Sequence, residues 1–268
     1  IRTGKKYLDL QLAIDETEEN DTLVLSSNVN IYSDITISNV KTLKIDLSDF
    51  DIYITKKIVN EGNLEIVNTG SKGNASKIVN PNNMTVITNN GSISLEKVQL
   101  KCGPSAYSLL NNKTANIIDS ILSGYGGVSN SKTGNLLASN SLFDGTYSSI
   151  YNQGSMNLAD IHINSGSYGI YNESSTINNQ IIIDKLAIQQ KNGTSGCAVY
   201  NRCGSMKIND FETNGSINNY TNSTLEIETG TINYQLVNSG TATINNLNLN
   251  YDETGSNYSS ARNIVTNT

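Results

Sequence analysis

Few side chains able to do acid–base or nucleophilic chemistry stand at useful spacings in this chain. The stretch from 101 to 180 holds only four acidic residues: Asp119, Asp144, Asp160 and Glu173. None is adjacent to another in the sequence, whereas glycoside hydrolysis needs two carboxylates that flank the glycosidic bond to be cleaved. The three aspartates fall near one recurring turn, so we expect them to stabilise it, with weak calcium binding as the alternative. His162 is the only histidine, and we expect it on an outward strand position, where it builds no Ser–His or Cys–His pair.

Three cysteines offer thiol chemistry without a metal-binding pattern. Cys102 is expected to be a small buried residue. Cys197 and Cys203 stand six residues apart, and they could form a local disulfide in an oxidising compartment or pack separately as free thiols. The spacings of cysteine and histidine match no metal site, so we predict neither a metal nor a cofactor.

The composition limits the class of protein. Of 268 residues, 18 are Lys or Arg and 24 are Asp or Glu, a net charge of −6. We therefore expect no nucleic-acid partner, because phosphate contacts need a basic face. No run of about 18 apolar residues exists, so we expect no membrane insertion. Asn, Ser and Thr number 41, 32 and 24, yet 37% apolar residues and only two prolines argue against disorder.

One short pattern recurs: an apolar residue, any residue, asparagine, and then a polar turn followed by alternating apolar residues. Its asparagines are Asn60, Asn89, Asn111, Asn130, Asn152, Asn172, Asn201, Asn219 and Asn238. From 60 to 238 they span 178 residues in eight steps, so the mean step is about 22 residues. Two steps of 29 residues predict mobile loops at 70–83 and 184–196.

Each step contains three short runs with the period-2 alternation of strands that bury one face. Met156 and Leu158 form one inward pair, and Ile161 and Ile163 form the next. Three strands in one step, without room for a helix, predict one coil of a right-handed parallel β-helix, with coils about 4.8 Å apart. A leucine-rich repeat has a similar period but wants a helical return, which is missing. We therefore predict an all-β parallel β-helix whose asparagines pair along an inner corner.

The two ends differ from the repeat. Residues 7–17 carry apolar residues at helical spacing, and an amphipathic helix can cover the open end of a solenoid. We predict a capping helix within 1–21 and a β-helix over 22–268. The chain begins at Ile1 without methionine and closes on another asparagine pattern at Asn267, so we expect a mature piece of a protein that continues.

The opening stretch LQLAIDETEENDTLVLSSNVNIYSDITISNVKTLKIDLSDFDIYITKKIVNEGNLEIVNTG resembles secreted β-helix proteins of Gram-positive and gut bacteria, within the pectate-lyase-like superfold. Those proteins run from a helix through D-T-I-x-L and I-T-I-D-L-N-G to I-x-N-x-G-x-L-x-I. The later units IYNQGSMNL and VYNRCGSMKI extend the resemblance over nearly the whole chain, and adhesin-like proteins of gut archaea are similar. The chain departs from the pattern at Leu47-Ser48-Asp49, which replaces Leu-Asn-Gly. The resemblance implies a secreted, surface-displayed, adhesin-like protein, and such families mark no catalytic residues.

The same fold also carries polysaccharide lyases and glycosidases, so an enzyme of that kind, or an inactive relative, is the alternative function. Lyases of this fold place an Arg or Lys base beside calcium-binding acids, but the arginines are far from the mid-chain aspartates in sequence: Arg2, Arg202 and Arg262. The polygalacturonase motifs N-T-D, D-D, G-H-G and R-I-K are all missing. A trimeric phage spike is disfavoured, because a capping helix argues for a self-contained monomer.

Tyrosine is frequent, with 14 residues, and its positions follow the repeat. Tyr151, Tyr171 and Tyr200 each stand directly before a ladder asparagine. A second column stands four or five residues before it: Tyr107, Tyr125, Tyr147, Tyr168 and Tyr234. Because equal positions in successive coils stack, we predict two rows of exposed rings, which either cover the sheet or bind a ligand.

For the ligand-binding hypothesis we single out five tyrosines: Tyr147, Tyr151, Tyr168, Tyr171 and Tyr200. Tyrosine combines apolar area with a hydroxyl, which suits sugar rings or a protein surface. The sequence therefore predicts a non-catalytic, extracellular bacterial adhesin-like protein, monomeric, whose rigid β-helix binds a host glycan or an extracellular protein.

Overall fold

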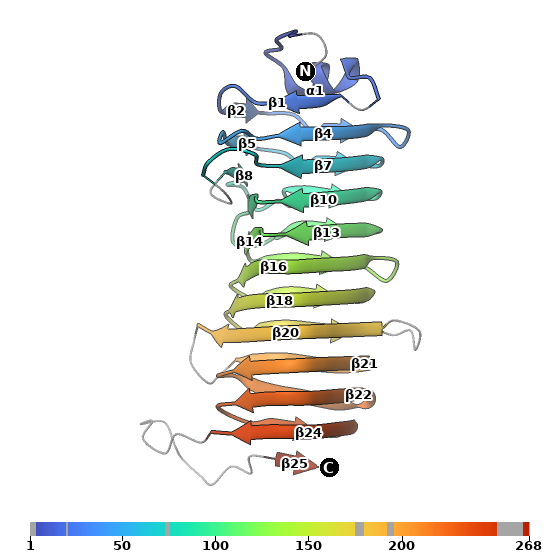
Figure 1. Ribbon diagram of the computed structural model, residues 1–268, viewed down its shortest axis with the longest axis vertical. Helices are drawn as coiled ribbons and strands as arrows, with labels where there is room; N and C mark the ends of the chain where they lie inside the picture. Colours follow the sequence, from blue (N-terminus) through green and yellow to red (C-terminus); the bar gives the residue numbers. More distant parts are fainter. Residues whose placement is uncertain are drawn as a thin grey trace.

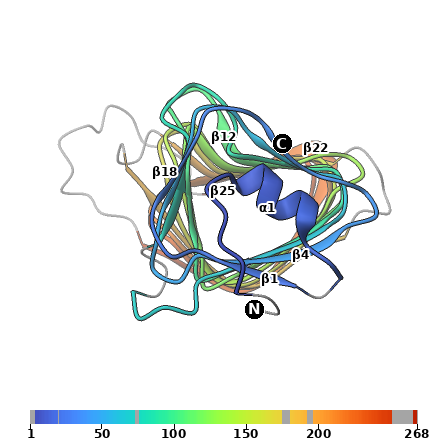
Figure 2. The ribbon, with the colours of Figure 1, turned by 90° about the horizontal axis from the view of Figure 1, so that it is seen from above.

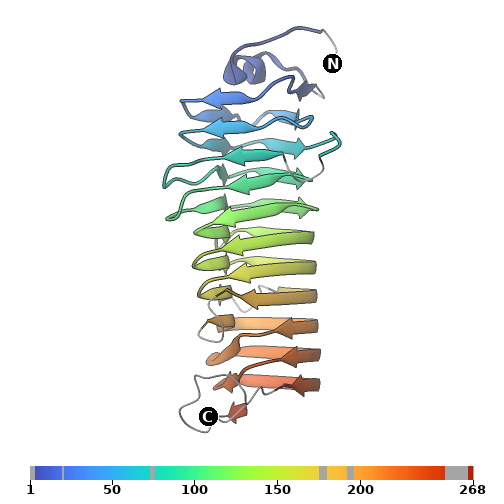
Figure 3. The same ribbon diagram turned by 90° about the vertical axis from the view of Figure 1, so that its left-hand side faces the viewer.

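The computed structural model is an all-parallel β-solenoid in which each coil contributes one strand to each of three faces. The structure describes residues 4–19, 21–72, 76–174, 180–191 and 196–250, and the backbone of 265–267. The coils stack along one long axis, with α1 at one end and β25 at the other (Figures 1 and 3). This architecture confirms the parallel β-helix predicted from the repeat.

The strands alternate between the three faces in chain order. The first face contains β1 (Thr22–Val24), β4 (Thr42–Asp46), β7 (Asn63–Val67), β10 (Ser92–Glu96) and β13 (Thr114–Ile118). The second face contains β2 (Val29–Ile31), β5 (Ile52–Ile54), β8 (Lys77–Val79), β11 (Gln99–Lys101) and β14 (Ile121–Gly124). The third face contains β3 (Ile35–Ile37), β6 (Ile58–Asn60), β9 (Ile87–Asn89), β12 (Tyr107–Asn111), β15 (Gly126–Asn130), β17 (Ser148–Asn152), β19 (Tyr168–Glu173), β23 (Leu236–Asn238) and β25 (Val265–Asn267).

In the C-terminal half the strands run through the corners without a break. Four of them supply the first and second faces together: β16 (Asn135–Gly145), β18 (Ser155–Ser165), β20 (Gln180–Gln190) and β24 (Thr241–Leu249). Two others supply all three faces: β21 (Cys197–Thr213) and β22 (Ser216–Ile232).

The core consists of apolar columns that run along the axis. On the first face Leu64, Ile93 and Ala115 lie in register on β7, β10 and β13, and all three are buried. The alternation of buried and exposed positions within each strand is the period-2 pattern of the sequence. Full burial of one such Leu or Ile side chain contributes roughly 1.5–3 kcal/mol.

The nine repeat asparagines form one continuous buried ladder at the end of the third face. From Asn60 to Asn238, the amide nitrogen of each donates to the side-chain oxygen of the next, at 2.7–3.0 Å. Most of these amides also bond a backbone carbonyl; that of Asn152, for example, reaches the Gly154 carbonyl at 3.0 Å. The ladder is therefore satisfied internally, as a buried amide requires. The backbone of Asn267 pairs with that of Asn238 and continues the same register.

The N-terminal helix α1 (Leu10–Glu16) lies across the open end of the solenoid (Figure 2). Asp9 caps it by accepting from the Leu12 amide at 2.8 Å. Leu10 and Ile14 are buried over the first coil. In the described part of the chain, no helix has the length and apolarity needed to cross a membrane.

The helix also protects the edge of the first coil. The Gln11 side chain accepts from the Thr36 amide at 2.8 Å and donates to the Thr36 carbonyl at 3.1 Å. These bonds occupy backbone groups of β3 that would otherwise offer an edge for aggregation. The helix is shorter than the predicted 7–17, and Leu8 and Leu12 are exposed rather than part of its buried face.

The predicted loops are wrong in their bounds. The segment 70–83 contains the strand β8, and 184–190 is the second half of β20, where Leu186 and Ile188 are buried. The extra residues of that coil are divided between the two connections that flank β20. Residues 192–195 of the expected loop lie outside the described residues.

Candidate functional site

Eight tyrosine rings form one connected row on the outside of the third face and at the corner that leads into it. We call them the tyrosine strip: Tyr107, Tyr125, Tyr147, Tyr151, Tyr168, Tyr171, Tyr200 and Tyr220. Neighbouring ring centroids are 4.6–6.4 Å apart, within the range of favourable aromatic pairs. The strip follows six successive coils, from that of β12 to that of β22, so its length is about 24 Å at about 4.8 Å per coil.

The shared register predicted for the tyrosines before the ladder asparagines is confirmed, but their rings are half-buried rather than exposed. Tyr151, Tyr171 and Tyr200 occupy one register on β17, β19 and β21. The rings of Tyr171 and Tyr200 stack at 4.6 Å with 20° between their planes. All three are half-buried, because they lean on one another along the face.

The second predicted column is wrong in its register. Tyr107 pairs with Gly126 on the next coil, so Tyr125 lies one residue earlier, at the corner. Tyr147 is displaced in the same way, and its ring stacks on that of Tyr125 at 5.0 Å. The corner rings nevertheless join the row, because Tyr168 contacts both Tyr147 and Tyr171. Tyr234 stands two residues before β23, as Tyr168 stands two before Ile170.

A missing side chain makes room for the first ring of the strip. A Cβ atom at Gly126 would lie 2.1 Å from the Cε1 atom of Tyr107. Tyr107 can therefore extend over β15 and contact Tyr151, two coils away, at a centroid distance of 6.4 Å.

A row of polar side chains runs beside the rings. We call Gln153, Glu173 and Arg202 the polar row, since each directly follows a ladder asparagine. The Tyr151 hydroxyl donates to Glu173 Oε2 at 2.6 Å and accepts from Gln153 Nε2 at 2.8 Å. Arg202 forms an ion pair with Glu173. Planar donors and acceptors are thus held in fixed positions next to the aromatic surface.

Three phenols of the strip, those of Tyr107, Tyr151 and Tyr200, hold their protons strongly. Burial, then the hydrogen bond to Glu173, raises the pKa of Tyr151 above its usual range. A hydrogen bond with Tyr220, followed by burial, raises the pKa of Tyr200 to about 12, and burial raises that of Tyr107 to about 12. At neutral pH the hydroxyls of Tyr107, Tyr151 and Tyr200 are therefore neutral.

Sequence reasoning missed two parts of this surface. Tyr220 follows its ladder asparagine instead of preceding it, although its spacing of 20 residues from Tyr200 is close to one coil. The ring distance between these two tyrosines is 4.8 Å. The polar row likewise follows the ladder asparagines, and its residue type changes from coil to coil, so the sequence shows no repeat there.

Two of the three mid-chain aspartates lie at the predicted turn, but the prediction is wrong for Asp144, which lies within the second face, while Asn140 takes the corner position of its coil. Asp119 and Asp160 adopt φ of 50° and 51° at the corner between the first and second faces, a conformation that Asp and Asn tolerate better than most residues. Asp160 pairs with Lys185 at 3.1 Å, and Asp144 pairs with Lys191. Among the described residues, no group of three His, Cys, Asp or Glu side chains is arranged to hold a metal ion.

All three cysteines are free thiols, so the disulfide that the spacing left open does not form. Cys197 and Cys203 both lie on β21: Cys197 stands at the start of its third-face segment, and Cys203 stands at the corner that follows Asn201. Cys197 is buried, with its Sγ atom 3.1 Å from the Val199 carbonyl. Burial raises the pKa of its thiol to about 11. Cys102 is buried as expected.

Comparison with known proteins adds no identity. No protein-family model, no curated protein and no solved structure matches the chain. Because one fold can carry unrelated functions, the function has to be argued from the surface itself.

Proposed function

We propose that the protein is a non-catalytic, extracellular bacterial surface protein whose tyrosine strip binds an extended glycan. One observation carries the proposal: eight rings form an unbroken row of about 24 Å along the axis. Aromatic rings pack against the apolar faces of sugars, while fixed polar groups orient the hydroxyls. The polar row supplies such groups at the side of the strip.

The shape of the strip favours a linear polymer over a folded protein. Protein interfaces concentrate their energy in a compact central cluster surrounded by a rim. Here the rings follow one another from coil to coil, and the repeat of the coils is comparable with that of a linear polysaccharide. The charges of Glu173 and Arg202 neutralise each other, which suits a neutral glycan.

The extracellular location and the adhesin-like role rest on the resemblance of the repeat units to secreted β-helix proteins. A rigid solenoid suits display at a surface, because it holds its outer positions at fixed spacing. The competing explanation is that stacked tyrosines only stabilise the face, as aromatic pairs do in any sheet.

The test is binding of defined linear oligosaccharides of increasing length. Affinity should rise with each added sugar until the ligand spans the strip, and then level off. The double substitution Tyr151→Ser and Tyr171→Ser removes two central rings and should weaken binding by more than about tenfold, since each hot-spot ring contributes more than about 1 kcal/mol.

Tyr53→Ser is the matched control, because Tyr53 is 40% exposed on the second face and lies outside the strip. It should leave the affinity unchanged, and all variants should keep a β-rich circular dichroism spectrum. Unchanged binding by the double variant together with a lowered melting temperature would assign the rings to sheet stabilisation. If an extracellular protein binds through the same rings and no glycan does, the strip is a binding surface but the proposal of a glycan ligand is wrong.

A further inference from the structure

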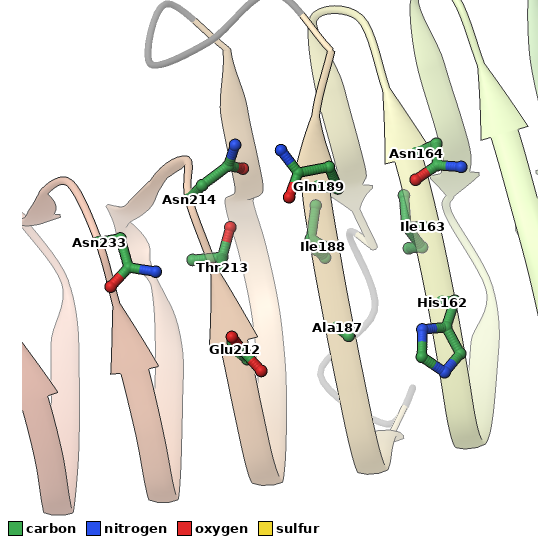
Figure 4. A pocket seen from close by; sticks show the side chains of 10 residues that line it. All are labelled: His162, Ile163, Asn164, Ala187, Ile188, Gln189, Glu212, Thr213, Asn214 and Asn233. Carbon is green, nitrogen blue, oxygen red and sulfur yellow. The ribbon is translucent and has the colours of Figure 1, made fainter.

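A polar hollow of about 250 Å³ lies on the outside of the second face, apart from the tyrosine strip. Its walls come from β18, β20 and β21, together with Asn214 and Asn233, which directly follow β21 and β22. Figure 4 shows its lining side chains. His162, Ala187 and Glu212 form one row across three neighbouring strands (Figure 4), and backbone pairing places them in one register. Asn164, Gln189 and Asn233 line the hollow nearer to the strand ends.

The hollow exists because one outward side chain is small. Ala187 stands between His162 and Glu212, so the two longer side chains flank a gap two coil spacings wide, or about 9.6 Å between their strands. The floor of the gap is the backbone of β20. A longer side chain at 187 would fill the space that the neighbouring strands leave open.

The lining groups keep their hydrogen-bonding capacity. Within the described ranges, the side chains of His162, Asn164, Glu212 and Asn233 take part in no hydrogen bond or ion pair with the rest of the chain. Asn214, at the edge of the same hollow, differs because its side chain accepts from the Gln190 amide at 2.7 Å. Four groups are thus available to a ligand.

A second hollow shows the contrast. It lies on the first face near the N-terminal end, and Lys44 and Glu65 are among its lining residues. Their side chains bind each other at 2.5 Å, and Asn63 donates to the Thr42 hydroxyl at 3.4 Å. Its main polar groups are therefore already paired, whereas those of the hollow at Ala187 are not.

We propose that the hollow at Ala187 binds one neutral sugar ring. Amides and an imidazole can both donate and accept, and the Glu212 carboxylate accepts; vicinal hydroxyls match this mixture. The only charged side chain in the lining is Glu212, so a phosphate or a carboxylate ligand is disfavoured. The lining has no Tyr, Trp or Phe ring, so hydrogen bonds rather than stacking on a large aromatic face provide the recognition. The proposal for this hollow does not depend on the function proposed for the tyrosine strip.

The chain contains its own reporter for this proposal. His162 is the only histidine, so its two imidazole C–H signals are the only ones of their kind in the proton NMR spectrum. The protein is titrated at constant pH with glucose, galactose, mannose and N-acetylglucosamine in the millimolar range. At least one of these sugars should shift the imidazole signals with saturation.

Two variants and one control locate the effect. Ala187→Leu fills the hollow and should weaken the saturable response by at least about tenfold, while Thr231→Leu should leave it intact. Thr231 is the matched control because it lies in the same register, one coil beyond Glu212, and does not line the hollow. Glu212→Gln should also weaken the response, since it replaces a charged acceptor by a neutral one.

The strip variant Tyr151→Ser with Tyr171→Ser separates this site from the proposed function, because it should retain the imidazole response. The absence of a saturable shift with all four sugars overturns the proposal. So does a response that survives Ala187→Leu, or one produced by Ca²⁺ or Zn²⁺ and not by a sugar.

Discussion

Replacing Asn152 by leucine tests the asparagine ladder near its middle. The Asn152 amide donates to Asn172 Oδ1 and to the Gly154 carbonyl, both at 3.0 Å. Its own oxygen accepts from the Asn130 amide at 2.7 Å. Leucine is similar in size but has no polar atoms, so all three bonds are lost inside a fully buried column.

The expected cost follows from these three bonds. Each net hydrogen bond contributes about 1 kcal/mol, and a buried acceptor left without its donor costs about 1–3 kcal/mol. Asn130 keeps two carbonyl partners, at 3.0 and 3.3 Å, so most of the loss falls on the oxygen of Asn172. The apolar surface of leucine returns roughly 1 kcal/mol. We therefore expect a destabilisation of about 2 kcal/mol, which lowers the melting temperature of a chain of this size by roughly 4–8 °C.

The assay is thermal and urea unfolding followed by circular dichroism. Asn157→Leu is the matched control, because Asn157 belongs to the same coil but is exposed on β18. A surface change of this kind should stay within about 0.5 kcal/mol. If Asn152→Leu and Asn157→Leu unfold at the same midpoint, the ladder does not stabilise the solenoid and our account of the repeat is wrong.

Three further predictions concern the strip and the thiols. Gly126→Val should destabilise the protein by about 1–3 kcal/mol and displace the Tyr107 ring, because its Cβ would lie 2.1 Å from that ring; thermal unfolding measures this, and an unchanged midpoint would contradict it. The folded-state pKa of about 12 for Tyr107 and Tyr200 exceeds the unfolded value of about 10. The folded state therefore binds these protons more tightly, so stability should be complete below about pH 10 and fall as pH rises toward 12, as unfolding midpoints and tyrosinate absorbance will show. Half-buried Cys203 should react with iodoacetamide in the native state while buried Cys197 should react only after unfolding; mass spectrometry of the peptides distinguishes them, and equal labelling would refute their assigned burial.

The ladder could be predicted from the sequence because its chemistry demands equal positions in every coil. A buried amide such as Asn152 finds a partner only if the next coil presents another amide at the same place, so the repeat of the residue reveals the repeat of the backbone. The loop bounds had no such signal. A step of 29 residues between Asn172 and Asn201 tells how many residues are extra, but not that they divide around β20.

The hollow and the strip's full length depend on contacts between coils that no single unit contains. The gap at Ala187 becomes visible only when β18, β20 and β21 are aligned, and β21 has irregular pairing at Asn201/Cys203. Likewise, the reach of Tyr107 over Gly126 combines a long side chain on one coil with a missing one on the next. Such complementarity depends on the register between neighbouring coils. The spacing of the asparagines fixes that register only at one corner.

The ladder also determines what the outer surface of the third face can present. Because side chains alternate across a strand, an inward asparagine forces the residues before and after it to point outward. The two outward positions are about 6.6 Å apart along the strand, so each coil offers one site for the aromatic row and one for the polar row. Tyr151 and Gln153 flank Asn152 in this way, and they bond each other at 2.8 Å. A ligand lying along the strip would therefore meet rings and polar groups already ordered by the buried amides, and it would not have to offset the entropy of fixing them.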